Sequence, residues 1–181
     1  RVLVLDNSEL GPVCGMAVGN SFAEAVSKES PYAILFASTA DGRDLASRLA
    51  ARLKLGLTGD ANDLEIDDEG RLVQLKPALG GNVVAPILSK TLPNLVTLRP
   101  GLLTPAAPEP GAAATVEQIP ALPYNGPDVR LLKEEIQEDQ IGLILANAPV
   151  VVGVGMGVGG LDGLAKVQEM ARSVGATLAT T

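Results

Sequence analysis

The sequence lacks histidine altogether and holds a single cysteine, Cys14, in 181 residues. Without histidine, the chain cannot form Ser-His-Asp or Cys-His nucleophilic triads or histidine-ligated metal sites. One cysteine excludes an intrachain disulfide, a Cys-x-x-Cys redox pair and a cysteine-bound iron–sulfur cluster. We interpret Cys14 as a small buried apolar side chain or a surface thiol, and the low cysteine usage as typical of a reducing compartment.

Aromatic and basic residues are also scarce. Aromatics make up 2% of the chain against 46% hydrophobic residues, so the core must be built from aliphatic side chains, as in an α/β sheet. Lysine and arginine number 14 against 21 acidic residues, which gives a net charge of −7. A nucleic-acid partner would require clustered basic residues and aromatic stacking platforms, so we expect none.

No residue from Ile141 to Leu161 is charged, and this run is long enough to cross a bilayer. Six glycines, Asn147 and Pro149 interrupt it. Helix breakers at this density favour a buried strand that leads into a glycine loop. We therefore expect no membrane span, and we find no pattern of a secretory signal in the opening residues.

The first third of the chain alternates strand and helix patterns, as a parallel α/β sheet does. Residues 2–5 and 32–37 are short apolar runs that predict buried strands. Between them we expect a helix over 21–28, capped by Ser21 and Glu24, which would complete a βαβ unit. A second helix, capped by Asp41 or Thr39, carries a leucine stripe at helical spacing: Leu45, Leu49 and Leu53.

Antiparallel additions follow. Residues 64–67 and 72–75 alternate around Asp68-Glu69-Gly70, which predicts a hairpin, and 83–88 and 95–98 predict two more strands. Seven prolines between 100 and 127 indicate a long surface excursion or linker. Beyond it, the expected elements are an edge-like strand over 129–138, a short helix over 141–148, a strand over 149–154, a helix from 161 and a strand over 176–181.

The sequence Gly155-Met156-Gly157-Val158-Gly159-Gly160 has the form G-x-G-x-x-G between a predicted strand and a predicted helix. Such glycines let a phosphate approach the backbone while the helix start supplies free N–H groups. A nicotinamide cofactor would also need an acidic residue near the end of the next strand, and 176–181 has none. The pyrophosphate of FAD could use the same loop, and glycines that only allow tight packing remain the structural alternative.

Two charged clusters admit a functional and a structural interpretation. Arg43, Arg48 and Arg52 could bind an anion, but a solvated helix face is the simpler interpretation. Asp67, Asp68 and Glu69 could bind a cation, but a charged hairpin tip is the simpler interpretation. We expect no metal site and no catalytic acid–base pair.

Several segments, in order, are similar to electron transfer flavoprotein alpha subunits. Ser-Thr-Ala-Asp-Gly-Arg-Asp-Leu at 38–45 resembles the point where a strand of that family passes into a helix. Residues 149–157 with the following helix, closing at 175–178, resemble the opening of the family's FAD domain. Each motif alone is common, whereas their order and spacing are specific. The other matching segments in the first domain are 48–53, 56–60, 76–82 and 96–101.

The resemblance implies a two-part α/β architecture. Residues 1–138 would form a parallel-sheet, nucleotide-hydrolase-like domain with antiparallel additions that lacks its opening strands. Residues 139–181 would form the first βαβ part of a second, flavin-binding α/β domain. Cofactor contacts would fall on Gly155, Met156, Gly157 and Thr181, with most of the FAD site outside this chain. The family carries arginine where this chain has Met156, and its pattern implies an arginine after Thr181.

The resemblance also implies a function. The chain would be an electron carrier with no catalytic residue of its own, relaying electrons from flavin dehydrogenases to an acceptor through FAD. Its partner would be an electron transfer flavoprotein beta subunit, with AMP as an optional ligand there. A membrane-bound acceptor is compatible with the absence of a membrane span. The expected location is the cytoplasm, or the mitochondrial matrix in a eukaryote. A non-redox adenine-nucleotide-binding module and an NAD-dependent dehydrogenase stay open as alternatives.

Overall fold

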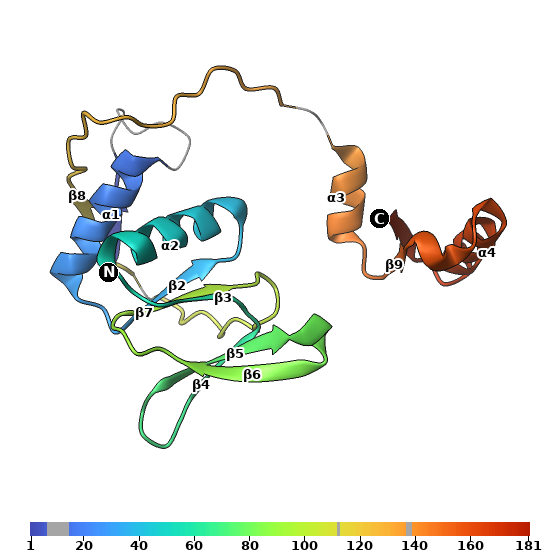
Figure 1. The fold of residues 1–181 in the computed structure, drawn as a ribbon, viewed down its shortest axis with the longest axis horizontal. Helices are drawn as coiled ribbons and strands as arrows, with labels where there is room; N and C mark the ends of the chain where they lie inside the picture. The colour runs from blue at the N-terminus through green and yellow to red at the C-terminus, as the bar shows by residue number, and fades with distance from the viewer. Residues whose placement is uncertain (7–14, 112, 137–138) are drawn as a thin grey trace. The chain divides into compact units, whose positions relative to one another are not determined.

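The computed structural model describes residues 1–6, 15–111, 113–136 and 139–181 (Figure 1). The chain divides into two compact units, Arg1–Leu132 and Lys133–Thr181. Cys14 lies outside the described residues.

Parallel strands form the centre of the first unit. Strands β2 (Ala33–Ala37), β7 (Asn94–Leu98) and β3 (Leu57–Ala61) lie in the order β2-β7-β3. Strands β1 (Val2–Leu5) and β8 (Val116–Ile119) pair in parallel as a separate sheet. The expected βαβ unit is therefore wrong in one respect, because the first strand pairs with β8 and not with β2.

Two helices cover one face of the β2-β7-β3 sheet (Figure 1). They are α1 (Met16–Glu29) and α2 (Ala40–Leu53), which also pack against each other. As predicted, Thr39 caps α2 by accepting a hydrogen bond from the N–H of Gly42 at 3.2 Å. Leu49 is completely buried between helix and sheet, and the core is aliphatic as expected, apart from one edge-on ring contact between two phenylalanines.

Helix α1 begins earlier than the sequence predicts. Ser21 is not its cap but lies in its interior, 2% exposed, where its hydroxyl donates to the carbonyl of Ala17. That hydroxyl also accepts a hydrogen bond from the N–H of Leu122 at 2.8 Å. The true start is capped by Asp128, which accepts from the N–H groups of Met16 and Ala17.

The other face of the parallel sheet is covered by an antiparallel one. Strands β4 (Asp63–Ile66), β5 (Leu72–Ala78) and β6 (Val83–Leu88) pair in the order β4-β5-β6. The predicted hairpin and the predicted 83–88 strand are confirmed. Buried Leu72 packs with Ala61 and Val96 of the parallel sheet, so the first unit has three layers: helices, parallel sheet and antiparallel sheet. A short 3-10 turn, Leu79–Gly81, joins β5 to β6.

The proline-rich segment is less irregular than expected, because it contains β8. Beyond β8 the chain runs along α1 as far as Asp128. The strand expected over 129–138 is wrong for the part that the structure describes, since 129–136 is extended chain without strand pairing.

The second unit contains α3 (Gln140–Asn147), β9 (Val151–Val154), a 3-10 turn at Met156–Val158, α4 (Leu161–Ser173) and β10 (Thr177–Thr180). Strands β9 and β10 pair in parallel, with α4 as their crossover. The uncharged run 141–161 is thus divided among a short helix, a strand and a glycine loop. Within the described residues, no helix is long and apolar enough to span a membrane.

Candidate functional site

The glycine loop lies at the carboxyl ends of the two parallel strands of the second unit. Gly155 follows β9 directly, and Thr181 follows β10. The carboxyl edge of a parallel sheet is where α/β folds bind ligands. The register Thr180↔Val154 brings these two strand ends together.

Two of the predicted site residues are neighbours. The N–H of Thr181 donates to the carbonyl of Val154 at 3.1 Å. A Cβ atom added to Gly155 would lie 3.6 Å from the hydroxyl oxygen of Thr181. At the strand ends, the hydroxyl of Thr181 therefore lies beside the backbone of Gly155, which no side chain covers.

The loop itself depends on glycine at its far end. Gly159 and Gly160 have φ values of 81° and 89°, the left-handed region that favours glycine. Gly163, which the sequence analysis did not single out, has a second reason to be glycine. A Cβ there would overlap the carbonyl oxygen of Val158, so the 3-10 turn packs directly on the first turn of α4. A glycine three residues into the predicted helix was the available sequence signal.

Gly157 is different, because a Cβ added there would meet nothing within 4 Å. Its neighbour Met156 is 95% exposed. Among the described residues, neither packing nor backbone strain accounts for glycine at position 157. An open position beside a helix start leaves room for a phosphate to approach the backbone.

The electrostatics of the loop do not favour an anion. Met156 carries no charge and cannot donate a hydrogen bond from its side chain. Asp162, which the sequence analysis also missed, lies in the first turn of α4 and places a negative charge beside the helix start. The loop thus offers backbone N–H groups and space, but no cationic side chain.

A second polar group lies at the carboxyl edge of the β2-β7-β3 sheet. Asp60 accepts a hydrogen bond from Ser38 and forms an ion pair with Arg43 at 3.0 Å. The backbone N–H of Asp60 donates to the buried hydroxyl of Thr97 at 2.8 Å. The Ser38 hydrogen bond, followed by the charge of Arg43, holds the pKa of Asp60 below its ordinary value of 3.8. The hydrogen-bonding groups of this cluster are paired with one another, so the cluster stabilises the ends of β3 and β7 and the start of α2.

The remaining charged clusters follow their structural interpretations. Arg48 forms an ion pair with Asp44 at 2.7 Å on the surface of α2. Asp67 accepts hydrogen bonds from Arg71 within the β4–β5 hairpin, and the bond from the Arg71 N–H is the first cause of the lowered pKa of Asp67. The described residues contain no group of three or more acidic, histidine or cysteine side chains suited to a metal.

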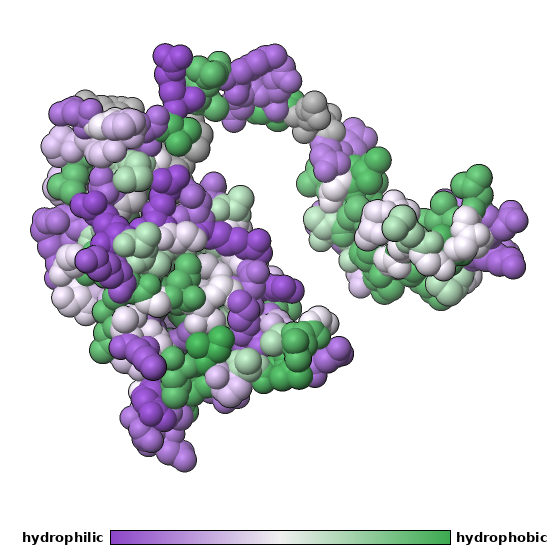
Figure 2. All heavy atoms as spheres, in the orientation of Figure 1, coloured by the Kyte–Doolittle hydropathy of each residue, from purple (hydrophilic) through white to green (hydrophobic). Residues whose placement is uncertain are grey.

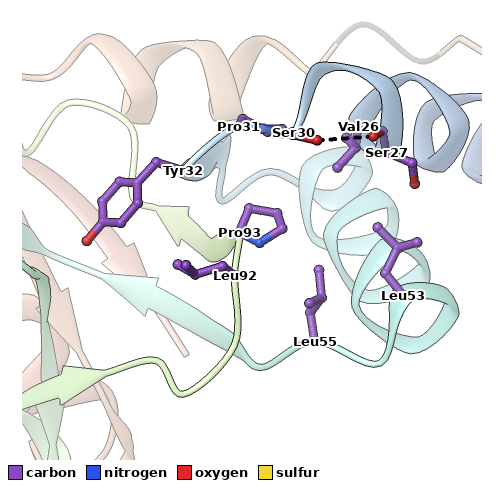
Figure 3. A pocket seen from close by; sticks show the side chains of 9 residues that line it. All are labelled: Val26, Ser27, Ser30, Pro31, Tyr32, Leu53, Leu55, Leu92 and Pro93. Carbon is purple, nitrogen blue, oxygen red and sulfur yellow. Dashed lines mark hydrogen bonds between the residues drawn. The ribbon is translucent and has the colours of Figure 1, made fainter.

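A hollow of about 600 Å³ opens where α1 and α2 end beside the start of β2 (Figure 3). Its walls are mainly apolar, including Leu53, Leu92 and Pro93. The hydroxyls of Ser27 and Ser30 donate to backbone carbonyls of α1. With its polar groups already engaged, the hollow gives no chemical indication of a ligand.

Comparison with known proteins places the chain in a family. Residues 1–123 match the family model described as the electron transfer flavoprotein domain. The chain is 34% identical, over 96% of its length, to the electron transfer flavoprotein subunit alpha of Thermoanaerobacterium thermosaccharolyticum, of which it covers 53%. The corresponding subunit of Clostridium acetobutylicum is 31% identical over the whole chain, which covers 55% of it.

A third relative has a different name. It is the lactate dehydrogenase (NAD(+),ferredoxin) subunit LctC of Acetobacterium woodii, 33% identical over the whole chain, which covers 43% of it. The chain spans about half the length of these curated relatives. The family model covers most of the chain, and the described fold joins parallel sheets to an antiparallel one as the sequence led us to expect. The chain therefore belongs to the electron transfer flavoprotein family.

Proposed function

We propose that this protein serves as the FAD-carrying alpha subunit of an electron transfer flavoprotein. In this role it relays electrons from flavin dehydrogenases to an acceptor and is itself a carrier, not a catalyst. The observation that carries the proposal is the open glycine loop at the carboxyl ends of β9 and β10, in a chain of this family.

The loop residues would act through backbone and space. Gly155 and Thr181 would present a backbone surface and a hydroxyl, while Gly157 and the backbone of Met156 would leave room for the pyrophosphate. FAD, when bound, supplies the redox chemistry. Because Met156 brings no charge and Asp162 opposes an anion, cationic groups outside this loop would have to balance the phosphates.

The proposed partners follow from the family. A companion beta subunit, with AMP as its candidate ligand, and flavin dehydrogenases are the expected partners. Because one relative is named as a lactate dehydrogenase subunit, the same electron-carrying role inside a dehydrogenase complex is a second candidate. The proposed location is the cytoplasm, or the mitochondrial matrix in a eukaryote, and a membrane-bound acceptor remains compatible with it.

The test is expression of the reading frame that encodes these residues together with a beta subunit. We expect the purified complex to show the visible absorbance of oxidised flavin and to be bleached by a reduced flavin dehydrogenase. Gly157→Val should lower FAD occupancy, whereas Ala165→Val on the exposed face of α4 should not. A colourless complex that binds adenine nucleotides would favour the non-redox module, and one that binds NAD in place of FAD would favour a dehydrogenase.

A further inference from the structure

We propose that the carboxyl edge of the β2-β7-β3 sheet binds a phosphate group, held by Arg43, Lys76 and Arg99. The three residues belong to the first unit, whereas the glycine loop belongs to the second. The proposal therefore goes beyond the flavin role and does not depend on it. Ligands of parallel α/β sheets bind at this edge, where strands end and helices begin. A free phosphate ion and the phosphate of a nucleotide share this chemistry.

Two of the cations come from the ends of parallel-sheet elements. Arg43, in the first turns of α2, forms an ion pair with Asp60 at 3.0 Å and donates from Nε to the hydroxyl of Ser38 at 3.0 Å. Arg99 follows β7 directly, and its N–H donates to the carbonyl of Ala61 at 3.3 Å. Both residues are therefore fixed beside the last residues of β2 and β3.

Lys76 reaches the same edge from the antiparallel sheet. Leu72 and Gln74 on β5 are buried toward the parallel sheet, and strand alternation directs Lys76 to that side as well. A Cβ atom added to Gly59 would lie 4.0 Å from the Nζ of Lys76. Since Gly59 precedes Asp60 on β3, the ammonium group lies beside the end of this strand.

The three cations surround a single carboxylate. The hydrogen bond from Ser38 is the first cause of the lowered pKa of Asp60. The charges of Arg43, Arg99 and Lys76 lower this pKa further, so all three act at the position of Asp60. Figure 2 shows hydrophilic residues on this side of the first unit. The cluster carries three positive charges around one negative charge.

The excess of positive charge has no counterpart among the described residues. Lys76 and Arg99 form no ion pair with any carboxylate that the structure describes, and Asp60 is already paired with Arg43. The whole chain has 21 acidic and 14 basic residues, so a local positive excess runs against its composition. Like charges held close together repel one another. An anion bound among them would offset this repulsion.

The side chains, and not the helix start, would bind the anion. Thr39 already accepts a hydrogen bond from the N–H of Gly42, and Asp41 adds a negative charge to the first turn of α2. A guanidinium group offers two parallel N–H donors that match two phosphate oxygens, and an ammonium group adds a point charge. Arg99, which is exposed, has its side chain available for such a paired contact.

A titration of the full 181-residue chain with sodium phosphate, without FAD, tests the proposal. Amide NMR signals of Ser38, Gly59 and Asp60 report on the site. We expect these signals to shift and to saturate with phosphate, and not to do so with sodium chloride at matched ionic strength, which only screens charge. Shifts that fail to saturate, or that chloride reproduces, would overturn the proposal.

Two arginine variants provide a matched comparison. Arg99→Gln should weaken phosphate binding at least about tenfold, since it removes charged hydrogen bonds to the ligand. Arg52→Gln removes the same charge in the last turn of α2, about 20 Å from the start of this helix, and should change binding no more than about twofold. Melting curves establish that both variants are folded. Equal weakening in the two variants would mean that phosphate responds only to the net charge of the chain.

Further titrations identify the source of the phosphate. Tighter binding of AMP than of inorganic phosphate at the same signals would assign the group to a nucleotide, whereas equal affinity would assign the site to free phosphate. Saturable binding of a glutamate-rich peptide, with no response to either phosphate compound, would make the cluster a protein-docking surface and overturn the proposal. Because FAD is absent throughout, none of these outcomes bears on the flavin role, which is tested by the absorbance of the assembled complex.

Discussion

Asp128 caps α1 by accepting a hydrogen bond from the N–H of Met16 at 2.8 Å, although 112 positions separate them in the chain. The other carboxylate oxygen accepts from the N–H of Ala17 at 2.9 Å. The start of the helix is therefore stabilised by the far end of the first unit, and no residue near Met16 in the sequence indicates it.

This cap makes the stability of the first unit pH-dependent. The N–H groups of Ala17 and Met16 hold the pKa of Asp128 below its ordinary value of 3.8. A lowered native pKa stabilises the fold above the ordinary value, and this contribution is lost as pH falls through the native pKa. We expect Asp128→Asn to lower the melting temperature at neutral pH and to converge with the unaltered chain below pH 3.8. Glu134→Gln, on the exposed segment that follows, should leave the melting temperature unchanged at both neutral and acidic pH. If the melting temperatures of Asp128→Asn and the unaltered chain differ by the same amount at every pH, the cap does not have this role.

The two kinds of glycine in the loop should respond differently to alanine. Gly163→Ala would force a Cβ against the carbonyl oxygen of Val158 and should destabilise the second unit by about 1–3 kcal/mol, as overpacking does. Gly157→Ala meets open space and should leave its stability nearly unchanged. Amide hydrogen exchange in α4 measures both effects. Similar loss of protection in both variants would show that position 157 is constrained by packing.

Asp60 is a non-glycine residue in the left-handed region, with φ of 57°. Asp60→Gly and Asp60→Ala both remove the carboxylate that binds Ser38 and Arg43, but only alanine retains the backbone strain. The alanine variant should be less stable than the glycine variant by about 1 kcal/mol, the usual cost of this conformation. Urea denaturation of the two variants gives the difference directly. Equal stabilities would mean that the backbone of β3 relaxes at this position.

The 181-residue chain alone should bind FAD weakly or not at all. Its second unit has a two-stranded sheet and one glycine loop, which would leave most of the cofactor in water. Titration of FAD, followed by quenching of flavin fluorescence, tests this expectation. Saturable one-to-one binding in the micromolar range or tighter would show that the site is more complete than the loop suggests.

Elements set by local signals were predictable from the sequence. The Thr39 cap and the spacing of Leu45, Leu49 and Leu53 define α2, and the pattern around Asp68-Glu69-Gly70 defines the hairpin. Elements that depend on distant partners were not. Strand β3 lacks an apolar run, and β8 lies among prolines. Both are held by pairing with strands far away in the sequence, so no local pattern predicts them.

The misassigned cap of α1 shows the same limit. Ser21 and Glu24 have the spacing of a capping box, but the helix begins before them, at Met16, where Asp128 caps it. In the candidate site, the placement of Gly155, Met156, Gly157 and Thr181 at two strand ends followed from the pattern. The packing of Gly163 and the position of the Asp162 charge could not be predicted from the sequence, because both depend on how the 3-10 turn packs against α4.

The pairing of β1 with β8 has a consequence for cleavage of the chain. Strand β7 lies before the proline-rich segment and β8 lies within it, and each is held by hydrogen bonds to other strands of the first unit. A protease cut between Leu102 and Glu109 would therefore divide the first unit covalently without separating its halves. The β8 fragment would stay attached through β1, the Ser21 hydroxyl and the start of α1. Two such fragments, expressed separately, should reassemble into a native-like unit when mixed.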